Sequence, residues 1–219
     1  MHEAVYSIFR VPIESVDGNS YLVLRGKEAA IVDTGVPGSA GQILEAIRNV
    51  GSPRVSAIIL THYHMDHTGS AAELKEATGA KVYVHEADAP FVSGRERPPF
   101  PSTVPRDVVE RYSRMRHVEP DALLKDGDVV FGFRVVHVPG HTPGSIALYD
   151  GRSLFAGDNM NVREGSIQGS PAPYDWNNEM AKESLRKLLS LDFDVLLPGH
   201  GQPIVGEAAE AARRALLSR

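Results

Sequence analysis

The pattern of apolar positions in the first half of the chain indicates strands that alternate with helices. Four short apolar runs have the length and composition of buried strands. Between two of them, apolar residues recur at helical spacing over residues 43–50, and Gly51 ends this pattern. A second helix is predicted from Ser70 to Gly79, because Ser70 and Glu73 form a capping-box pattern. The predicted strands are residues 21–24, 29–32, 57–60 and 81–85.

The second half of the chain repeats this alternation after a proline-rich interruption. Residues 86–120 carry six prolines, and only residues 106–116 within them show a helical pattern. We expect this segment to be a surface excursion, either a plain loop or a lid over a pocket. Each half places polar residues directly after a strand and before a helix, so we expect two similar halves that face each other. The predicted strands are residues 129–138, 146–149, 153–156 and 194–197, and the predicted helices are residues 179–190 and 207–217.

The alternation of strands and helices indicates an α/β protein with helices layered around sheet. The chain has 219 residues, of which 42% are hydrophobic and 23% charged, values that are ordinary for a globular protein. We therefore expect one domain over residues 1–219, with the proline-rich excursion at about residues 86–120 as its irregular part.

Composition and charge exclude several classes of function. The chain contains no cysteine, which excludes disulfides, cysteine-ligated zinc and a cysteine nucleophile. The formal net charge is −5 and no basic run occurs, so we expect no nucleic-acid partner. No apolar stretch is long enough to cross a membrane, and residues 1–12 lack the apolar core of a secretory signal. We therefore expect a cytoplasmic protein without membrane association.

The main chemical signal follows the apolar run at residues 57–60. Residues 61–69 read THYHMDHTG and place His62, His64, Asp66 and His67 within six positions. Imidazole nitrogens suit zinc, iron and related metals, and carboxylate oxygens suit harder ions. We predict that this loop directs His62 and His64 one way and Asp66 and His67 the other, an arrangement that serves two adjacent metal ions.

Three more candidate ligands stand where other predicted strands end. His141 lies in PGHTPGS over residues 139–145, Asp158 ends the sequence FAGD, and His200 lies in PGHG. Each of them alone is typical of a turn residue beside glycine or proline. Their recurrence at strand ends, together with the first motif, predicts that distant segments converge on one metal site.

The order of these motifs from Asp33 to His200 resembles the metallo-β-lactamase superfamily in its glyoxalase-II-like form. The resemblance implies a four-layer αββα sandwich with the site at one edge between two sheets. It implies two divalent metal ions, with zinc expected and iron or manganese also compatible, and it implies that Asp33 orients the ligands. The implied ligand sets are His62, His64 and His141 for one metal and Asp66, His67 and His200 for the other, with Asp158 as the bridge.

The activity that the resemblance implies is hydrolysis of a small-molecule substrate. A metal-bridging hydroxide would attack an ester, thioester or lactone-type bond, and Asp66 would carry a proton to the leaving group. Enzymes of the hydroxyacylglutathione hydrolase type or the lactonase type are the nearest matches. The absence of cysteine separates the chain from the commonest metallo-β-lactamases, and Asn161 stands where many lactonases have tyrosine.

Two other interpretations of the same residues stay open. Persulfide dioxygenases resemble this scaffold but hold one iron with two histidines and one aspartate, here His62, His141 and Asp158. A non-catalytic metal-binding protein would use the same ligands, although structural metal sites are usually closed and rich in cysteine. The excursion could also form a homodimer contact.

Several other polar residues are candidates for packing, metal binding or substrate contact near the site. His85 and His137 lie within or at the end of predicted strands, and we expect them to pack rather than to bind metal. The segment after Asp158 offers candidates for substrate contact that could equally serve its turns. These candidates are Asn159, Asn161, Tyr174 and Trp176.

Overall fold

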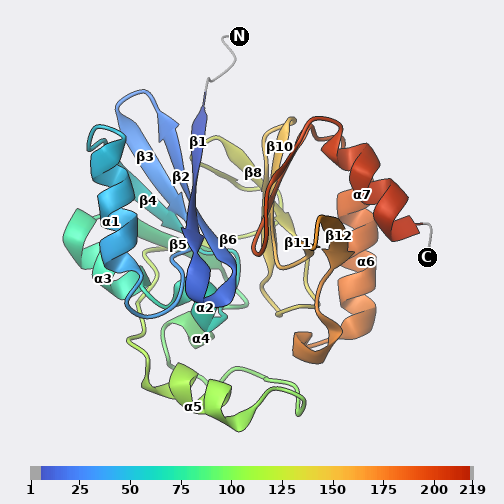
Figure 1. The fold of residues 1–219 in the computed structure, drawn as a ribbon. Helices are drawn as coiled ribbons and strands as arrows, with labels where there is room; N and C mark the ends of the chain where they lie inside the picture. The colour runs from blue at the N-terminus through green and yellow to red at the C-terminus, as the bar shows by residue number, and fades with distance from the viewer. Residues whose placement is uncertain (1–5, 218–219) are drawn as a thin grey trace.

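The computed structural model describes residues 6–217 and contains two six-stranded sheets that face each other (Figure 1). A two-stranded hairpin lies beside the second sheet. The first sheet contains β1 (Ser7–Ile13), β2 (Gly18–Arg25), β3 (Glu28–Val32), β4 (Arg54–Ile59), β5 (Lys81–His85) and β6 (Ala122–Leu124), in that order. The second sheet has the order β14 (Ile204–Val205), β13 (Val195–Pro198), β10 (Ser153–Gly157), β9 (Ile146–Tyr149), β8 (Phe133–His137) and β7 (Val129–Val130), and the hairpin pairs β11 (Met160–Arg163) with β12 (Ser166–Gly169).

Parallel strands bring the polar segments to a common edge. In the first sheet β3 runs parallel to β4, so that Asp33 and the loop beginning at Thr61 follow strands that end side by side. In the second sheet β10 runs parallel to β13, and Asp158 and His200 follow their ends in the same way. Because the carboxyl ends of parallel strands meet at one edge of a sheet, each half delivers its candidate ligands to one place.

Helices cover the outer faces of both sheets, which gives the expected four layers (Figure 1). Apolar residues of the helices face the sheets; Ile43 and Ile47 of the first helix and Leu188 of the sixth are buried. The outer helices are α1 (Ala40–Asn49) and α3 (Ala71–Thr78) on the first sheet and α6 (Asn178–Leu189) and α7 (Ala208–Leu217) on the second. Among the described residues, no helix has the length and apolar character that crossing a bilayer demands.

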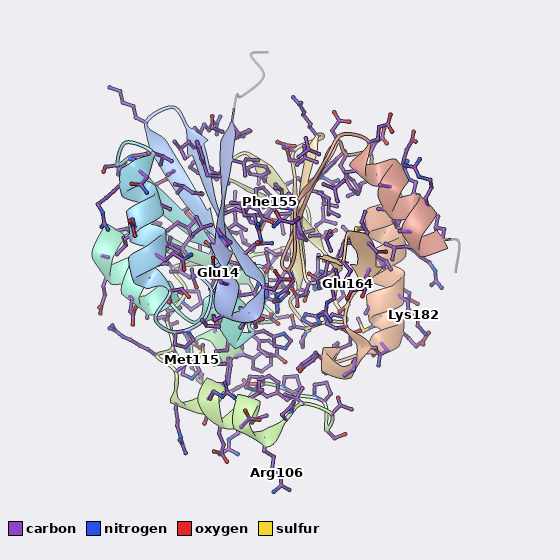
Figure 2. The ribbon with its side chains drawn as sticks, in the orientation of Figure 1. Glu14, Arg106, Met115, Phe155, Glu164 and Lys182 are labelled. Atoms are coloured by element: carbon purple, nitrogen blue, oxygen red, sulfur yellow. The ribbon has the colours of Figure 1, made fainter. Side chains whose placement is uncertain are left out.

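An aromatic core holds the two sheets together. The ring of Phe155 meets the rings of Tyr21 and Phe133 edge-on, with centroid distances of 5.3 Å in both cases. Figure 2 shows Phe155 between the sheets, and its side chain is almost fully buried. Aromatic pairs in this geometry stabilise a core by about 0.5–1.5 kcal/mol beyond their buried area. The core fixes the distance between the two sheet edges that carry the candidate ligands.

The structure corrects the expectation of a capping box at the start of α3. The Ser70 hydroxyl does not cap the helix; it donates to the Val36 carbonyl at 2.7 Å and accepts from the Ser39 amide at 2.9 Å. Ser70 therefore joins α3 to the segment before α1. The cause is tertiary: the start of α3 is buried against that segment, where Ser70 finds other partners.

The proline-rich excursion contains two helices, α4 (Ala89–Val92) and α5 (Arg106–Arg114). It crosses the same end of the molecule as the one-turn helix α2 (Met65–Thr68), and Arg106 points away from the body of the protein (Figures 1 and 2). Short 3-10 turns occur at Glu14–Val16 and Ala172–Tyr174. The excursion thus lies over the edge that collects the candidate ligands.

Candidate metal centre

All seven predicted ligands meet between the two sheets. They form three groups in which the potential ligand atoms lie within 4.8 Å of one another. Asp66 and His200 are partly exposed and line a cavity, and the other five candidates are at least nine-tenths buried. The one-turn helix α2 holds Asp66 and His67. The groups are His62, His64 and His141; His62, His67 and Asp158; and Asp66, His67 and His200.

Five inward-facing atoms of this cluster lack hydrogen-bond partners among the described residues. Buried polar atoms are normally paired, because an unpaired one costs about 1–3 kcal/mol. Divalent cations bind neutral imidazole nitrogens and carboxylate oxygens, so the donor set fits a metal. The unpaired atoms are the Nε2 atoms of His62, His64, His67 and His141 and Oδ1 of Asp158.

The two oxygens of Asp158 face different groups. Oδ1 lies 3.2 Å from His67 Nε2 and 3.4 Å from His200 Nε2. Oδ2 lies 3.4 Å from His141 Nε2. The carboxylate therefore stands between the all-histidine group and the group with Asp66, a position suited to a bridge.

Asp33 holds the first motif from behind, as the resemblance implied. Its Oδ2 lies 2.8 Å from Nδ1 of His67 and accepts from the Thr61 hydroxyl at 2.7 Å. Its Oδ1 accepts from the Thr61 amide at 2.8 Å. A carboxylate on Nδ1 turns Nε2 of the same ring toward the centre and makes it a better ligand.

Asp175 gives His141 the same support, and sequence reasoning missed it. Its Oδ1 lies 2.9 Å from His141 Nδ1, and the Ser170 hydroxyl contacts both groups. Asp175 follows the 3-10 turn at Ala172–Tyr174 and belongs to none of the metal motifs. No local pattern marks it, because its role depends on a contact with a loop 34 residues away.

A second missed carboxylate, Asp88, joins two ligand loops and is fully buried. Its Oδ2 accepts from the Tyr63 amide at 2.9 Å and from the Thr142 hydroxyl at 2.7 Å. Its Oδ1 accepts from the Gly144 amide at 2.6 Å. Burial raises the pKa of Asp88 to about 7, and the three donors oppose this rise. Asp88 thus ties the loop of His62 and His64 to the loop of His141.

The electrostatics of the cluster separate two kinds of histidine. Burial lowers the pKa of His64 to about 3 and that of His62 well below its usual value, so both rings are neutral. Burial also opposes charge on His200, but Asp158 and Asp66 raise its pKa to about 10. The neutral rings of His62 and His64 can bind a cation directly, whereas a protonated His200 must lose its proton when a metal binds.

The loop of His200 is joined to the first sheet as well as to its own. The Asn19 amide donates to the Gly199 carbonyl at 2.8 Å, and the Asn19 side chain donates to the Pro198 and Gly201 carbonyls at 2.9 and 2.8 Å. Nδ1 of His200 lies 3.1 Å from the Val16 carbonyl. The last ligand is therefore held in place by residues from the start of the chain.

The residues after Asp158 divide between support and cavity lining. Asn161 is buried, and its side chain accepts from the His200 amide at 2.9 Å and donates to the Asp158 carbonyl at 3.3 Å. Asn159 is also buried and donates to the Ala156 carbonyl, whereas Tyr174 lines a cavity at the cluster. Of these candidates for substrate contact, only Tyr174 faces that cavity.

His85 and His137 pack against each other, as expected. Their rings stack with centroids 3.9 Å apart and planes 12° apart. Neither belongs to a potential metal group among residues 6–217. Nε2 of His137 lies 3.0 Å from the Pro143 carbonyl, which places this pair beside the His141 loop without joining the cluster.

We expect a Gly199→Ala substitution to displace Asp158 and weaken metal binding. A Cβ at this position would overlap Asp158 Oδ1 and lie 2.9 Å from His67 Cε1. Gly41 is the control, because a Cβ there meets nothing within 4 Å and alanine favours the helix by about 0.5–1 kcal/mol. Metal content by mass spectrometry should fall for Gly199→Ala only; equal metal content in both variants would contradict the prediction.

Similarity to known proteins agrees with this geometry. The family model described as metallo-beta-lactamase superfamily matches residues 14–200. A Bacillus subtilis protein named "Probable metallo-hydrolase YflN" is 36% identical over 81% of this chain and 76% of its own length. Hydroxyacylglutathione hydrolase GloC of Haemophilus influenzae is 28% identical over 87% of this chain and 89% of its own length. The crystal structure of TTHA1623 in a di-iron-bound form has a TM-score of 0.73 and 31% identity, covering 94% of this chain and 98% of that chain.

Proposed function

Because this chain belongs to the metallo-beta-lactamase superfamily, we propose that it is a metal-dependent hydrolase of small-molecule ester, thioester or lactone-type bonds. The observation that carries the proposal is the set of unpaired, buried Nε2 atoms gathered in one cluster of candidate ligands, beside a cavity that can admit a substrate. The hydrolase names of YflN and GloC support the reaction class.

The proposed centre holds two divalent cations, with zinc expected. The two-sided position of Asp158 supports a pair, and the di-iron form of TTHA1623 shows that a similar fold accommodates one. When bound, the cations would supply Lewis acidity and lower the pKa of nearby water. His62, His64 and His141 would hold one ion, and Asp66, His67 and His200 would hold the other. Asp158, whose oxygens face both groups, would supply a further carboxylate ligand.

The chain's own residues would orient the substrate and move the proton. Asp66 lies at the cavity with 30% of its side chain exposed, and its Oδ2 is 3.3 Å from His200 Nε2. It is the carboxylate of the cluster most open to a substrate, and we assign to it the transfer of a proton to the leaving group. Buried Asp33, Asp88 and Asp175 keep the ligand rings in place during the reaction.

The test combines metal analysis with a panel of thioesters, esters, lactones, phosphodiesters and β-lactams. We expect about two metal ions per chain, loss of turnover after removal of the metal with a chelator, and recovery on addition of zinc. Thermal stability should fall on chelation, because metal at a thousandfold excess over its Kd stabilises the folded state by roughly 4 kcal/mol.

Each alternative has a distinct result in the same test. One iron per chain, with oxygen consumed in the presence of a persulfide and no hydrolysis, would identify the dioxygenase-like chemistry instead. Tight metal binding with no turnover across the panel would favour the non-catalytic metal-binding protein. Hydrolysis that persists at full rate without metal would refute the proposed centre.

A further inference from the structure

A cavity of about 310 Å³ opens directly onto the candidate metal centre. At its inner end lie His64, Asp66, His141, Asp158 and His200. Most of its other walls come from the excursion and from the segment after Asp158, and Val16, Val36 and Met65 complete them. This size is at the lower end of the range for small-molecule sites, which indicates a compact substrate.

One wall of the cavity is apolar and already packed. The Phe100 ring stacks parallel to the His64 ring, with an angle of 11° and centroids 6.0 Å apart. Phe100 also meets Tyr112 edge-on at 5.3 Å, and the Tyr112 hydroxyl donates to the Phe91 carbonyl at 2.7 Å. Because these rings hold one another, the wall does not need to form when a substrate binds. Val104, Val108 and Met65 extend it.

The lining of the cavity also includes a cation whose side chain has no partner among residues 6–217. The lining contains two arginines, Arg111 and Arg163, and no lysine. Arg111 forms an ion pair with Asp107 one turn earlier in α5. The Arg163 side chain has no hydrogen bond or ion pair within residues 6–217, although its backbone at the end of β11 is fixed by the pairing with Ser166. A free guanidinium at a cavity rim favours a carboxylate or phosphate.

The two walls lie on different sides of the cluster, which gives the substrate a direction. Phe100 covers His64, a member of the all-histidine group. Arg163 follows Val162, whose amide donates to the His200 carbonyl at 3.0 Å, so it lies on the side of His200 and Asp66. We assign to Asp66 the transfer of a proton to the leaving group. The leaving group and its charge should therefore lie on the side of the cavity where Arg163 is.

We infer that the substrate is an ester or thioester with a short apolar acyl group and an anionic leaving group. The acyl group lies against Phe100, Val104 and Val108, and the carboxylate or phosphate of the leaving group pairs with Arg163. Hydrolysis adds one water across the acyl bond: the acyl carbon gains the oxygen, the leaving sulfur or oxygen gains a proton, and the acid formed releases the second proton. This inference rests on the proposed hydrolase function.

The experiment uses the metal-loaded full-length chain and two probes of which one has a free carboxylate and the other a neutral methyl ester at the same position. They are the butanoyl thioester of 3-mercaptopropionate and the methyl ester of the same compound. We expect kcat/KM to favour the anionic probe by about tenfold, because a hydrogen bond between charged groups is stronger than a neutral one and part of its effect is lost at an exposed site. The preference should weaken as ionic strength rises.

Substitutions at Arg163 locate the source of this preference. Arg163→Gln should lower the ratio of the two kcat/KM values by about tenfold, mainly through KM for the anionic probe. Arg163→Lys should restore much of the ratio, because it restores the charge. Arg111→Gln is the matched comparison and should change the ratio less, because that guanidinium already has Asp107 as a partner.

Acyl length tests the apolar wall independently. From the acetyl to the butanoyl thioester, kcat/KM should rise by about fourfold per methylene, the value expected for a buried CH₂ group, and Phe100→Ala should flatten this slope. If the wild type cleaves both charged and neutral probes equally well, or if Arg163→Gln leaves the ratio as it was, the inference is wrong and the hydrolase function stands. If no probe of the wider panel is cleaved, the hydrolase function itself fails.

Discussion

An Asp158→Ala variant is expected to lose turnover of every substrate that the wild type cleaves, and to lose metal as well. Mutation of a residue that only supports a metal ligand typically lowers metal affinity or activity by about 10–100-fold. Mutation of Asp158, which faces both groups of candidate ligands, should have a larger effect. The structure gives the reason: Oδ1 approaches His67 and His200, while Oδ2 approaches His141. The two measurements are metal ions per chain and kcat.

Two further variants separate the charge of Asp158 from its shape. Asp158→Asn keeps the size of the side chain but removes the negative charge, and we expect it to keep at most one metal ion. Asp192→Ala removes a carboxylate whose side chain is 93% exposed and far from the cluster, and it should behave as the wild type. An Asp158→Ala protein with two bound metals and undiminished turnover would show that the bridging position is not used.

An Asp88→Ala variant is expected to weaken the all-histidine group selectively, although Asp88 touches no proposed metal. Loss of the carboxylate leaves the Tyr63 and Gly144 amides without their acceptors, so the loops of His62–His64 and of His141 lose their connection. We expect metal affinity at this group to fall by about 10–100-fold, as for other residues that orient ligands. Calorimetric titration of the metal-free protein with zinc should resolve one weakened and one nearly unchanged binding step.

A substitution at Asp33 should have the corresponding effect on the other ligand group, which contains His67. Asp33→Asn disturbs the contact with His67 Nδ1, so metal binding at the group of Asp66, His67 and His200 should weaken. Binding at the all-histidine group should stay nearly unchanged. Thr142→Val removes one of the three bonds to Asp88 and should have a smaller effect in the same direction as Asp88→Ala. If Asp88→Ala and Asp33→Asn weakened both steps equally, or if Asp88→Ala merely lowered the folded fraction, Asp88 would have a general structural role and no positioning role.

The contrast between ligands and supports shows what a sequence can predict here. His62, His64, Asp66 and His67 are close together in the chain, so metal chemistry imposes a recognisable spacing on them. Residues His141, Asp158 and His200 are recognisable because each follows an apolar strand, and all seven candidates do converge in the structure. The pairing into an αββα sandwich was likewise implied by the order of motifs.

The supporting residues follow no local rule. Asp88 bonds to residues 25, 54 and 56 positions away, and nothing near Asp88 in the sequence marks it. The Ser70 capping box was wrong for the related reason that a buried hydroxyl found tertiary partners. β1 and the β11–β12 hairpin were missed because five of the seven positions in β1 are partly buried or exposed and the hairpin mixes polar and apolar residues.

The attachment of the His200 loop to Asn19 and Val16 has a consequence for how the protein matures. A ribosome releases the His62–His67 segment long before His200, so the nascent amino-terminal half carries an incomplete set of ligands. The final ligand is positioned only after the two ends of the chain have come together, a slow contact between distant segments. Tight metal uptake should therefore follow synthesis of His200, and an occupied centre would show that the His200 loop has joined Val16 and Asn19.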